Sequence, residues 1–289
     1  ILLDGDCLYL NTNNGVDNTH RANRAPDAPS LIVLDKKTGR LLAWDEEKMG
    51  RLVYHCTWSS PAMGEVDGRK LVFFGGGDGV VYAFQALKSA PPAGEVKTLK
   101  RVWKFDCDPD APKENIHDYK KNRKEGPTNI KSMIVFCDGR VYVTAGGDIW
   151  WGKEKAWLKC IDASQTGDIT TTGEVWSYAV EKHCAATPAV YQGLVFVADC
   201  GGFVHCLDAK SGKMYWKHDA GGEMWGSPLA ADGKVYIGTR RRGFVVLAAG
   251  KEKKVISKIR LDSNMNATVT AANGTLYVAT MRKLYAVGR

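Results

Sequence analysis

A tight turn followed by an alternating strand recurs six times along the chain, and this repeat restricts the possible folds more than any other feature. The six segments lie at residues 4–10, 67–73, 138–143, 192–197, 232–237 and 273–278. Most of the turns are Asp-Gly or Asn-Gly, which supply the positive φ angles that a tight hairpin needs. The apolar residues that alternate after each turn predict half-buried strands. The last two spacings are 40 and 41 residues, and the earlier ones are lengthened by inserted loops.

Each unit contains the same four parts. A small-residue strand comes first, as in S-S-P-A-M at 59–63, and the turn and second strand follow. A third strand ends in an acidic turn, as in F-V-H-C-L-D at 203–208, and a fourth carries a tryptophan, as at Trp44 and Trp216. Four short antiparallel strands in such a unit are typical of a β-propeller blade. We therefore predict an all-β chain, a β-propeller of four-stranded antiparallel blades with about six repeat units, in a single domain over residues 1–289.

The pattern D-x-x-[ST]-G-x-x-x-W recurs at the ends of units and resembles the repeat of the pyrroloquinoline-quinone (PQQ) type propellers. The fifth unit departs from it, with no tryptophan and L-A-A-G at 247–250. Asp208, Ser211, Gly212 and Trp216 match this pattern fully, and the unit that ends at Trp44 matches it with one extra residue. In that family the tryptophan packs between neighbouring blades. Segments such as A-P-S-L-I-V-L-D-K-K-T-G, and W-K-F-D-C-D-P at Trp103, are similar to secreted bacterial proteins with PQQ-binding-like repeats.

This resemblance has consequences for location and for the number of blades. It implies a periplasmic or secreted protein, although no signal peptide is visible in this chain. Relatives of this type usually have eight blades. We therefore expect the six units to be the C-terminal part of a larger eight-bladed ring, and a closed ring of six blades is the alternative.

The composition excludes several classes of protein. No run of about 18 apolar residues occurs, so we expect no transmembrane segment. The formal charge is +8, but the basic clusters at 120–124 and 240–242 lie on no recognisable nucleic-acid module, and we predict no nucleic-acid partner. Eight cysteines are too sparse for a disulfide scaffold, and we expect most of them to be free thiols.

Three inserted loops, at 13–30, 107–131 and 147–156, are the best places for a binding site, since long loops in a compact fold are often functional. The adjacent Trp150 and Trp151 are the strongest candidates, because aromatic anchors are enriched at interfaces and stack on sugars. The candidate residues for binding on the propeller face or channel are Asp17, His20, His55, Trp58, Asp78, Asp148, Trp150, Trp151 and Trp225.

The first chemistry that the inserted loops suggest is a metal site. Asp17 and His20 are three residues apart and His55 lies at the start of the next unit. Imidazole with carboxylate suits zinc or another transition metal, but the sequence shows no second histidine close to His20 and no cysteine pair. We therefore assign no metal site and interpret Asp17 as a turn residue and His20 as a surface residue.

The resemblance to PQQ-type propellers also suggests that the chain could bind PQQ and act as a dehydrogenase. PQQ dehydrogenases of this fold hold the quinone between a tryptophan and a disulfide of adjacent cysteines, with calcium beside it and an aspartate as base. Asp78 and Asp148 are candidate bases or calcium ligands, and Trp58 and Trp225 are candidate stacking rings. The chain has no adjacent cysteines and no recognisable set of calcium ligands. We therefore predict no cofactor and no catalytic residues, with PQQ and calcium as the alternative.

Two classes of function remain. We predict a non-catalytic binding or scaffold protein of the bacterial cell envelope, which engages a protein partner or a small ligand through loops on the propeller face. The alternative is a PQQ-dependent alcohol or sugar dehydrogenase, or a propeller subunit of a periplasmic redox complex. Carbohydrate binding through Trp150 and Trp151 is a third hypothesis.

Overall fold

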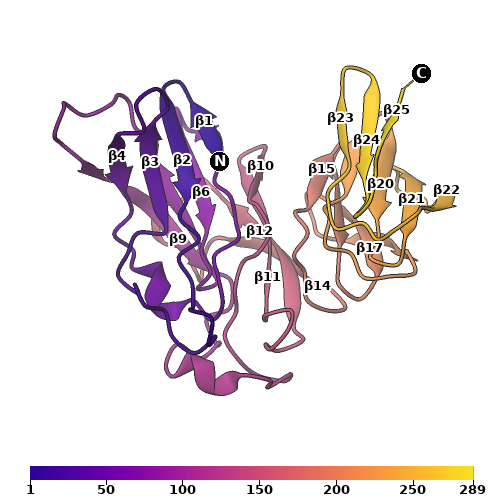
Figure 1. Ribbon diagram of the computed structural model, residues 1–289, viewed down its shortest axis with the longest axis horizontal. Helices are drawn as coiled ribbons and strands as arrows, with labels where there is room; N and C mark the ends of the chain where they lie inside the picture. The colour runs from indigo at the N-terminus through magenta and orange to yellow at the C-terminus, as the bar shows by residue number, and fades with distance from the viewer. Residues whose placement is uncertain (289) are drawn as a thin grey trace. The chain divides into compact units, whose positions relative to one another are not determined.

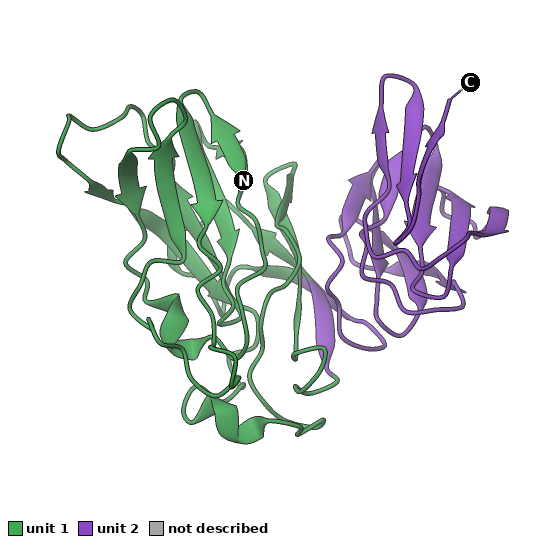
Figure 2. Ribbon diagram, in the orientation of Figure 1, with its two compact units in different colours: residues 1–154, 159–175 green, residues 155–158, 176–289 purple. Residues whose placement is uncertain are grey.

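A computed structural model describes residues 1–288 of the chain (Figure 1). It contains two compact units, one formed by residues 1–154 and 159–175 and the other by residues 155–158 and 176–289, coloured green and purple in Figure 2. We call them unit 1 and unit 2 and describe each by itself. A single domain over the whole chain stays a prediction. No helix of the described residues is long and apolar enough to cross a membrane.

The first two sheets lie in unit 1 and have five strands each. The order of the first is β1 (Leu2–Asp4), β2 (Cys7–Asn11), β3 (Leu31–Asp35), β4 (Leu41–Trp44), β8 (Lys97–Thr98). The order of the second is β13 (Gly167–Asp168), β9 (Arg101–Asp106), β7 (Val80–Gln85), β6 (Arg69–Gly75), β5 (Ala62–Val66). Two short 3-10 helices interrupt the loops of this unit, η1 (Met49–Leu52) and η2 (Ile116–Tyr119).

The other four sheets follow in chain order. The third is β10 (Val135–Cys137), β11 (Arg140–Gly146), β12 (Ala156–Asp162), β14 (Glu174–Ala179). The fourth is β15 (Ala189–Tyr191), β16 (Leu194–Ala198), β17 (Phe203–Asp208), β18 (Met214–Asp219). The fifth is β19 (Leu229–Ala231), β20 (Lys234–Gly238), β21 (Gly243–Ala248), β22 (Val255–Arg260). The sixth has three strands, β23 (Thr270–Ala272), β24 (Thr275–Ala279), β25 (Leu284–Val287).

The all-β prediction and the recurring set of antiparallel strands are confirmed. The structure differs from six identical blades in one respect that the repeat does not reveal. The two-residue strands β8 and β13 each add a fifth strand to a sheet, and both pair in parallel, with β4 and with β9. Both lie in segments inserted between repeat strands. Each inserted segment pairs with the edge strand of a sheet, where backbone N–H and C=O groups would otherwise be unpaired.

The hairpin turns have the backbone geometry that their sequences predict. At Asp67 and Gly68 φ is 49° and 71°, and at Asn273 and Gly274 it is 50° and 75°. Two successive positive φ angles define the type I′ turn, which matches the twist of the flanking strands. Each turn therefore fixes the register of the two strands that it joins, as in the pairing of β5 with β6 from Val66 opposite Arg69.

The acidic turn of the repeat explains why its aspartate and glycine recur. Asp208 Oδ1 accepts hydrogen bonds from the main-chain N–H of Lys210 (3.1 Å) and of Ser211 (2.9 Å). Gly212 then takes a φ of +70°, and a Cβ atom there would lie 2.6 Å from the Trp176 ring. The glycine is needed both for the left-handed backbone and for the room that the indole takes.

The indole groups of the repeat connect one sheet to the next. Trp103 of β9, Trp176 of β14 and Trp216 of β18 are buried. Their Nε1–H groups donate to the main-chain carbonyls of Ala163 (3.1 Å), Ala209 (3.1 Å) and Gly250 (2.8 Å), each just after the third strand of the following sheet. Each tryptophan therefore combines apolar burial with a satisfied polar group.

We expect Trp216→Ala to lower the free energy of unfolding by roughly 3–5 kcal/mol, the cost of truncating a large buried aromatic side chain. Trp216→Phe keeps an aromatic ring but removes the bond to Gly250, and should cost at least about 1 kcal/mol. Urea unfolding followed by circular dichroism measures both. Trp58→Ala, which truncates a far more exposed tryptophan, is the matched control and should cost less. A change below about 1 kcal/mol for Trp216→Ala would contradict its role between sheets.

Candidate functional site

Six of the predicted site residues meet in unit 1. The ring centroid of His55 lies 5.9 Å from that of Trp58, 5.3 Å from that of Trp150 and 5.4 Å from that of Trp151. Trp58 and Trp150 are themselves 5.5 Å apart and nearly perpendicular, at 85°. We call the set of His20, His55, Trp58, Trp150 and Trp151 the aromatic cluster; the sixth residue, Asp148, lies beneath it.

His20 brings the first inserted loop to this cluster. Its ring centroid is 5.0 Å from that of His55 and 4.5 Å from that of Trp151. The expectation that no second histidine lies close to His20 is therefore wrong, because the loop folds back over the residues that follow η1. His20 is also half-buried rather than a surface residue, and its Nδ1 is buried without a hydrogen-bond partner among the described residues.

Asp17 shapes the loop and does not enter the cluster. Its main-chain carbonyl accepts the N–H of His20 at 2.9 Å, which closes a turn. Its carboxylate accepts hydrogen bonds from Thr19 and from Arg24 Nε (2.8 Å), and these bonds lower the pKa of Asp17 to about 2. The interpretation of Asp17 as a turn residue is confirmed.

Asp148 forms the polar floor of the cluster. Its Oδ2 lies 3.2 Å from His55 Nδ1 and 3.1 Å from Lys131 Nζ, and its Oδ1 accepts the main-chain N–H groups of Trp150 (2.9 Å) and Trp151 (3.0 Å). The carboxylate is fully buried, and burial alone raises its pKa. The Lys131 ammonium and the contact with His55 outweigh that effect and hold the pKa of Asp148 below its usual range.

Lys131 is the site residue that the sequence did not indicate. Its side chain is only 1% exposed. The end of the second insertion pairs with the end of β11 through two main-chain hydrogen bonds between Asn129 and Gly146, at 2.8 and 3.1 Å. Lys131 Nζ also donates to Asn129 Oδ1 at 2.5 Å. A single lysine at the end of a highly charged loop is not distinctive in the sequence. Lys131 reaches Asp148 because the main chain at Asn129 pairs with Gly146.

The second insertion also supports Trp151 from outside. The main-chain N–H of Lys121 donates to the Trp151 carbonyl at 2.8 Å, and Lys120 Nζ lies 4.5 Å from the centre of the Trp151 ring. His117 stacks on Tyr54 with ring centroids 5.8 Å apart. All three inserted loops therefore contribute to one site in unit 1.

The remaining two candidates lie in other surroundings. Asp78 accepts hydrogen bonds from the Tyr82 hydroxyl (2.7 Å) and the Val80 N–H (3.2 Å), and burial raises the pKa of Asp78 to about 6. Trp225 belongs to unit 2, where its Nε1–H donates to Glu223 at 2.8 Å and Arg240 lies over its ring at 4.1 Å.

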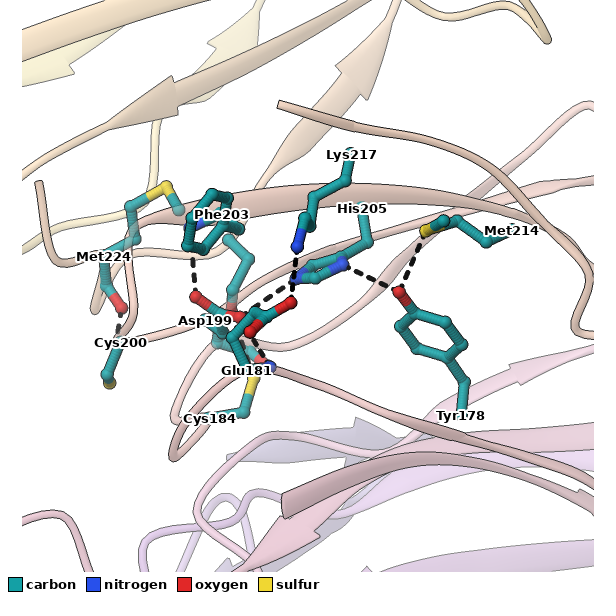
Figure 3. A network of polar contacts seen from close by, with 12 residues as sticks. Tyr178, Glu181, Cys184, Asp199, Cys200, Phe203, His205, Met214, Lys217 and Met224 are labelled. Carbon is teal, nitrogen blue, oxygen red and sulfur yellow. Dashed lines mark hydrogen bonds and ion pairs between the residues drawn. The ribbon is translucent and has the colours of Figure 1, made fainter. Parts of the chain in front are cut away.

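Unit 2 contains a polar network that the sequence analysis missed (Figure 3). Asp199 Oδ2 lies 2.9 Å from His205 Nε2, and His205 Nδ1 lies 3.1 Å from the Tyr178 hydroxyl. The Asp199 carboxylate also accepts the N–H groups of Phe203 (3.0 Å) and Glu181 (3.1 Å). Asp199 thus caps the turn after β16. Its position in the repeat was the signal that could have revealed it, because Asp78 and Asp148 follow β6 and β11 in the same way.

The candidate quinone residues do not fit a PQQ site. Asp148 is held by Lys131 and His55, and Asp78 by Tyr82, so both candidate carboxylates already have partners within the protein. The two candidate stacking rings, Trp58 and Trp225, belong to different units. Seven cysteines are free thiols, namely Cys7, Cys56, Cys107, Cys137, Cys160, Cys200 and Cys206, and Cys184 Sγ hydrogen-bonds to the Ala198 carbonyl at 3.0 Å. Within residues 1–288 no three His, Cys, Asp or Glu residues group as a metal site.

Known proteins resemble the chain in repeat type and fold. A family profile described as outer membrane protein assembly factor BamB matches residues 154–255. A 1-butanol dehydrogenase (cytochrome c) of Thauera butanivorans is 32% identical over 114 residues, which cover 35% of this chain and 16% of that enzyme. BamB from Moraxella catarrhalis has a TM-score of 0.57 at 16% identity, covering 98% of this chain and 67% of that one. The computationally designed Ika8 protein has a TM-score of 0.54 at 12% identity, covering 90% and 79%.

The chain is built of PQQ-like propeller repeats. The family match over residues 154–255 and the partial match to the dehydrogenase support this repeat type. At 12% and 16% identity the structural likenesses establish the propeller fold alone. The residues of the aromatic cluster lie outside the part of this propeller repeat protein that matches the BamB profile.

We expect Asp148→Asn to lower the free energy of unfolding by roughly 3–5 kcal/mol near neutral pH, because it leaves the buried Lys131 ammonium without its counter-charge. The folded pKa of Asp148 is depressed, so its contribution is complete above the unfolded value near 3.8 and is lost as the pH falls. The difference between wild type and variant should therefore shrink below about pH 4. Urea unfolding at neutral and acidic pH measures it.

Asp67→Asn is the matched control for this prediction, because it neutralises a turn carboxylate of the same unit whose side chain is 71% exposed, and it should change stability little. A cost for Asp148→Asn that stays the same down to strongly acidic pH would contradict the assigned ion pair.

Proposed function

We propose that this chain is a non-catalytic binding or scaffold protein of the bacterial cell envelope, and that it engages a partner protein through the aromatic cluster. The observation that carries the proposal is the pair Trp58 and Trp150, which are 38% and 39% exposed and meet almost at a right angle. Exposed indoles on one surface are typical of interaction sites, where tryptophan often supplies most of the binding energy.

Asp148, beneath the aromatic cluster, preorganises the turn that carries Trp150 and Trp151. Asp148 accepts the main-chain N–H groups of Trp150 and Trp151 and is itself held by the buried Lys131. Fixing the loop before a partner arrives reduces the entropy lost on binding. The same contacts occupy Asp148, one of the two candidate bases for a dehydrogenase, and this supports binding rather than catalysis.

The cell-envelope location is supported by repeat type. The matching family profile carries the description of an outer membrane protein assembly factor, and the fold is shared with BamB from Moraxella catarrhalis. A binding role and an extracytoplasmic location for this chain are inferences from that likeness.

The proposal is tested by selecting a random-peptide phage library against the purified chain in the presence of a metal chelator. Peptides with saturable affinity are then measured on Trp58→Ala and Trp150→Ala. We expect each variant to lose at least about 30-fold in affinity, the loss typical of truncating an interface hot spot. Trp225→Ala, which removes a tryptophan of unit 2, is the matched control and should bind normally. Selected peptides that bind all variants equally would contradict the proposal.

A dehydrogenase is the second candidate, and the partial match to the 1-butanol dehydrogenase favours it. The test is dye reduction with added PQQ, Ca²⁺ and primary alcohols. We expect no turnover. PQQ-dependent turnover that disappears in Asp148→Asn would favour the dehydrogenase over the binding protein.

A further inference from the structure

The two imidazoles of the aromatic cluster lie at a separation that suits one shared metal ion. The ring centroids of His20 and His55 are 5.0 Å apart and the rings are tilted by 53°. A zinc–nitrogen bond of about 2.0–2.1 Å places the ion about 3.1 Å from each ring centre, so two rings at this separation subtend about 107° at the ion. This angle is close to the tetrahedral value. We infer that His20 and His55 bind one divalent transition-metal ion, Zn²⁺ or Cu²⁺.

The surroundings of His55 fix the nitrogen that is free for a metal. Its Nδ1 faces the Asp148 carboxylate at 3.2 Å, and its Nε2 has no hydrogen-bond partner among the described residues. Metal-binding histidines commonly place one ring nitrogen against a carboxylate, which orients the ring and raises the basicity of the other nitrogen. Asp148 is held in turn by Lys131 and by two main-chain N–H groups. His55 is therefore a pre-oriented ligand and Asp148 a positioning residue.

His20 shows an unsatisfied group that a metal would satisfy. Its Nδ1 is buried and has no partner among residues 1–288. A buried polar nitrogen without a partner is costly and uncommon. His20 also has a φ of +54°, in the left-handed region that most residues avoid. Residues in this conformation are often found at ligand sites, and the centroid of the His20 ring lies 5.0 Å from that of His55.

Two imidazole ligands determine which metals the site favours and leave coordination positions open. Imidazole nitrogens favour zinc and copper over magnesium and calcium. No third His, Cys, Asp or Glu joins the pair within the described part of the chain. Water or a donor group of a bound molecule would therefore complete the coordination, as at open zinc sites. Only two protein ligands are present, and the Lys131 ammonium offsets the negative charge of Asp148 that would favour a cation. We therefore expect weaker metal binding than at a closed site with three or four protein ligands.

The inference is independent of the proposed partner binding and is tested with metal ions alone. The untagged chain is titrated with Cu²⁺ while tryptophan fluorescence is followed, and with Zn²⁺ in a calorimeter. Because Trp58, Trp150 and Trp151 surround His55, we expect bound Cu²⁺ to quench their emission. One equivalent of ion should bind, and His20→Ala and His55→Ala should each weaken binding at least about tenfold. His218→Gln, at a half-buried histidine of unit 2, is the matched control and should change nothing.

Two further measurements separate metal ligation from a general loss of structure. The Cu²⁺ spectrum in electron paramagnetic resonance should show coupling to two nitrogens, and His20→Gln should reduce it to one while circular dichroism stays unchanged. Asp148→Asn should weaken binding about tenfold or more without removing either nitrogen. Saturable binding that survives both histidine substitutions, or an absence of saturable binding by the folded chain, would overturn the inference. Because peptide selection is done with chelator present, its outcome does not depend on this one.

Discussion

The candidate site depends on one buried carboxylate. Asp148 lies beneath the cluster and contacts the Lys131 ammonium, the His55 imidazole and two main-chain N–H groups of the next turn. A buried charge is tolerated only where such contacts replace its hydration. The same contacts determine where the rings lie: one oxygen fixes the turn that carries Trp150 and Trp151, and the other orients His55. The arrangement of the exposed indoles therefore follows from the burial of this charge.

The propeller repeat explains why a carboxylate stands at this position. Asp78, Asp148 and Asp199 each follow the second strand of a sheet. Each accepts a main-chain N–H from a residue that follows it, namely Val80, Trp150 and Phe203. Their second contacts differ. Asp78 is bonded by Tyr82 and Asp199 by His205, and only Asp148 meets a lysine from an inserted loop. A structural position of the repeat has thus become part of a site where the insertions supply new partners.

The sequence predicted what local chemistry controls. The Asp-Gly and Asn-Gly turns, the alternating strands and the acidic turn before Gly212 depend on neighbouring residues, and the structure has them as predicted. It did not predict the parallel strands β8 and β13, because pairing at an open edge leaves no pattern in so short a segment. The pairing of Asn129 with Gly146, which buries Lys131, and the approach of His20 to His55 connect distant residues through loop paths that no periodicity encodes.

The three inserted loops of unit 1 meet at the aromatic cluster: the first and third supply rings, and the second supplies Lys131 beneath them. Nuclear Overhauser effects between protonated His and Trp rings in an otherwise deuterated chain measure this most directly. We predict cross-peaks from the His55 ring to the rings of Trp58, Trp150 and Trp151, and from His20 to Trp151. Their assignment is checked by the loss of the His55 signals in His55→Gln. A folded chain in which His55 shows no cross-peak to any of the three indoles would contradict the account.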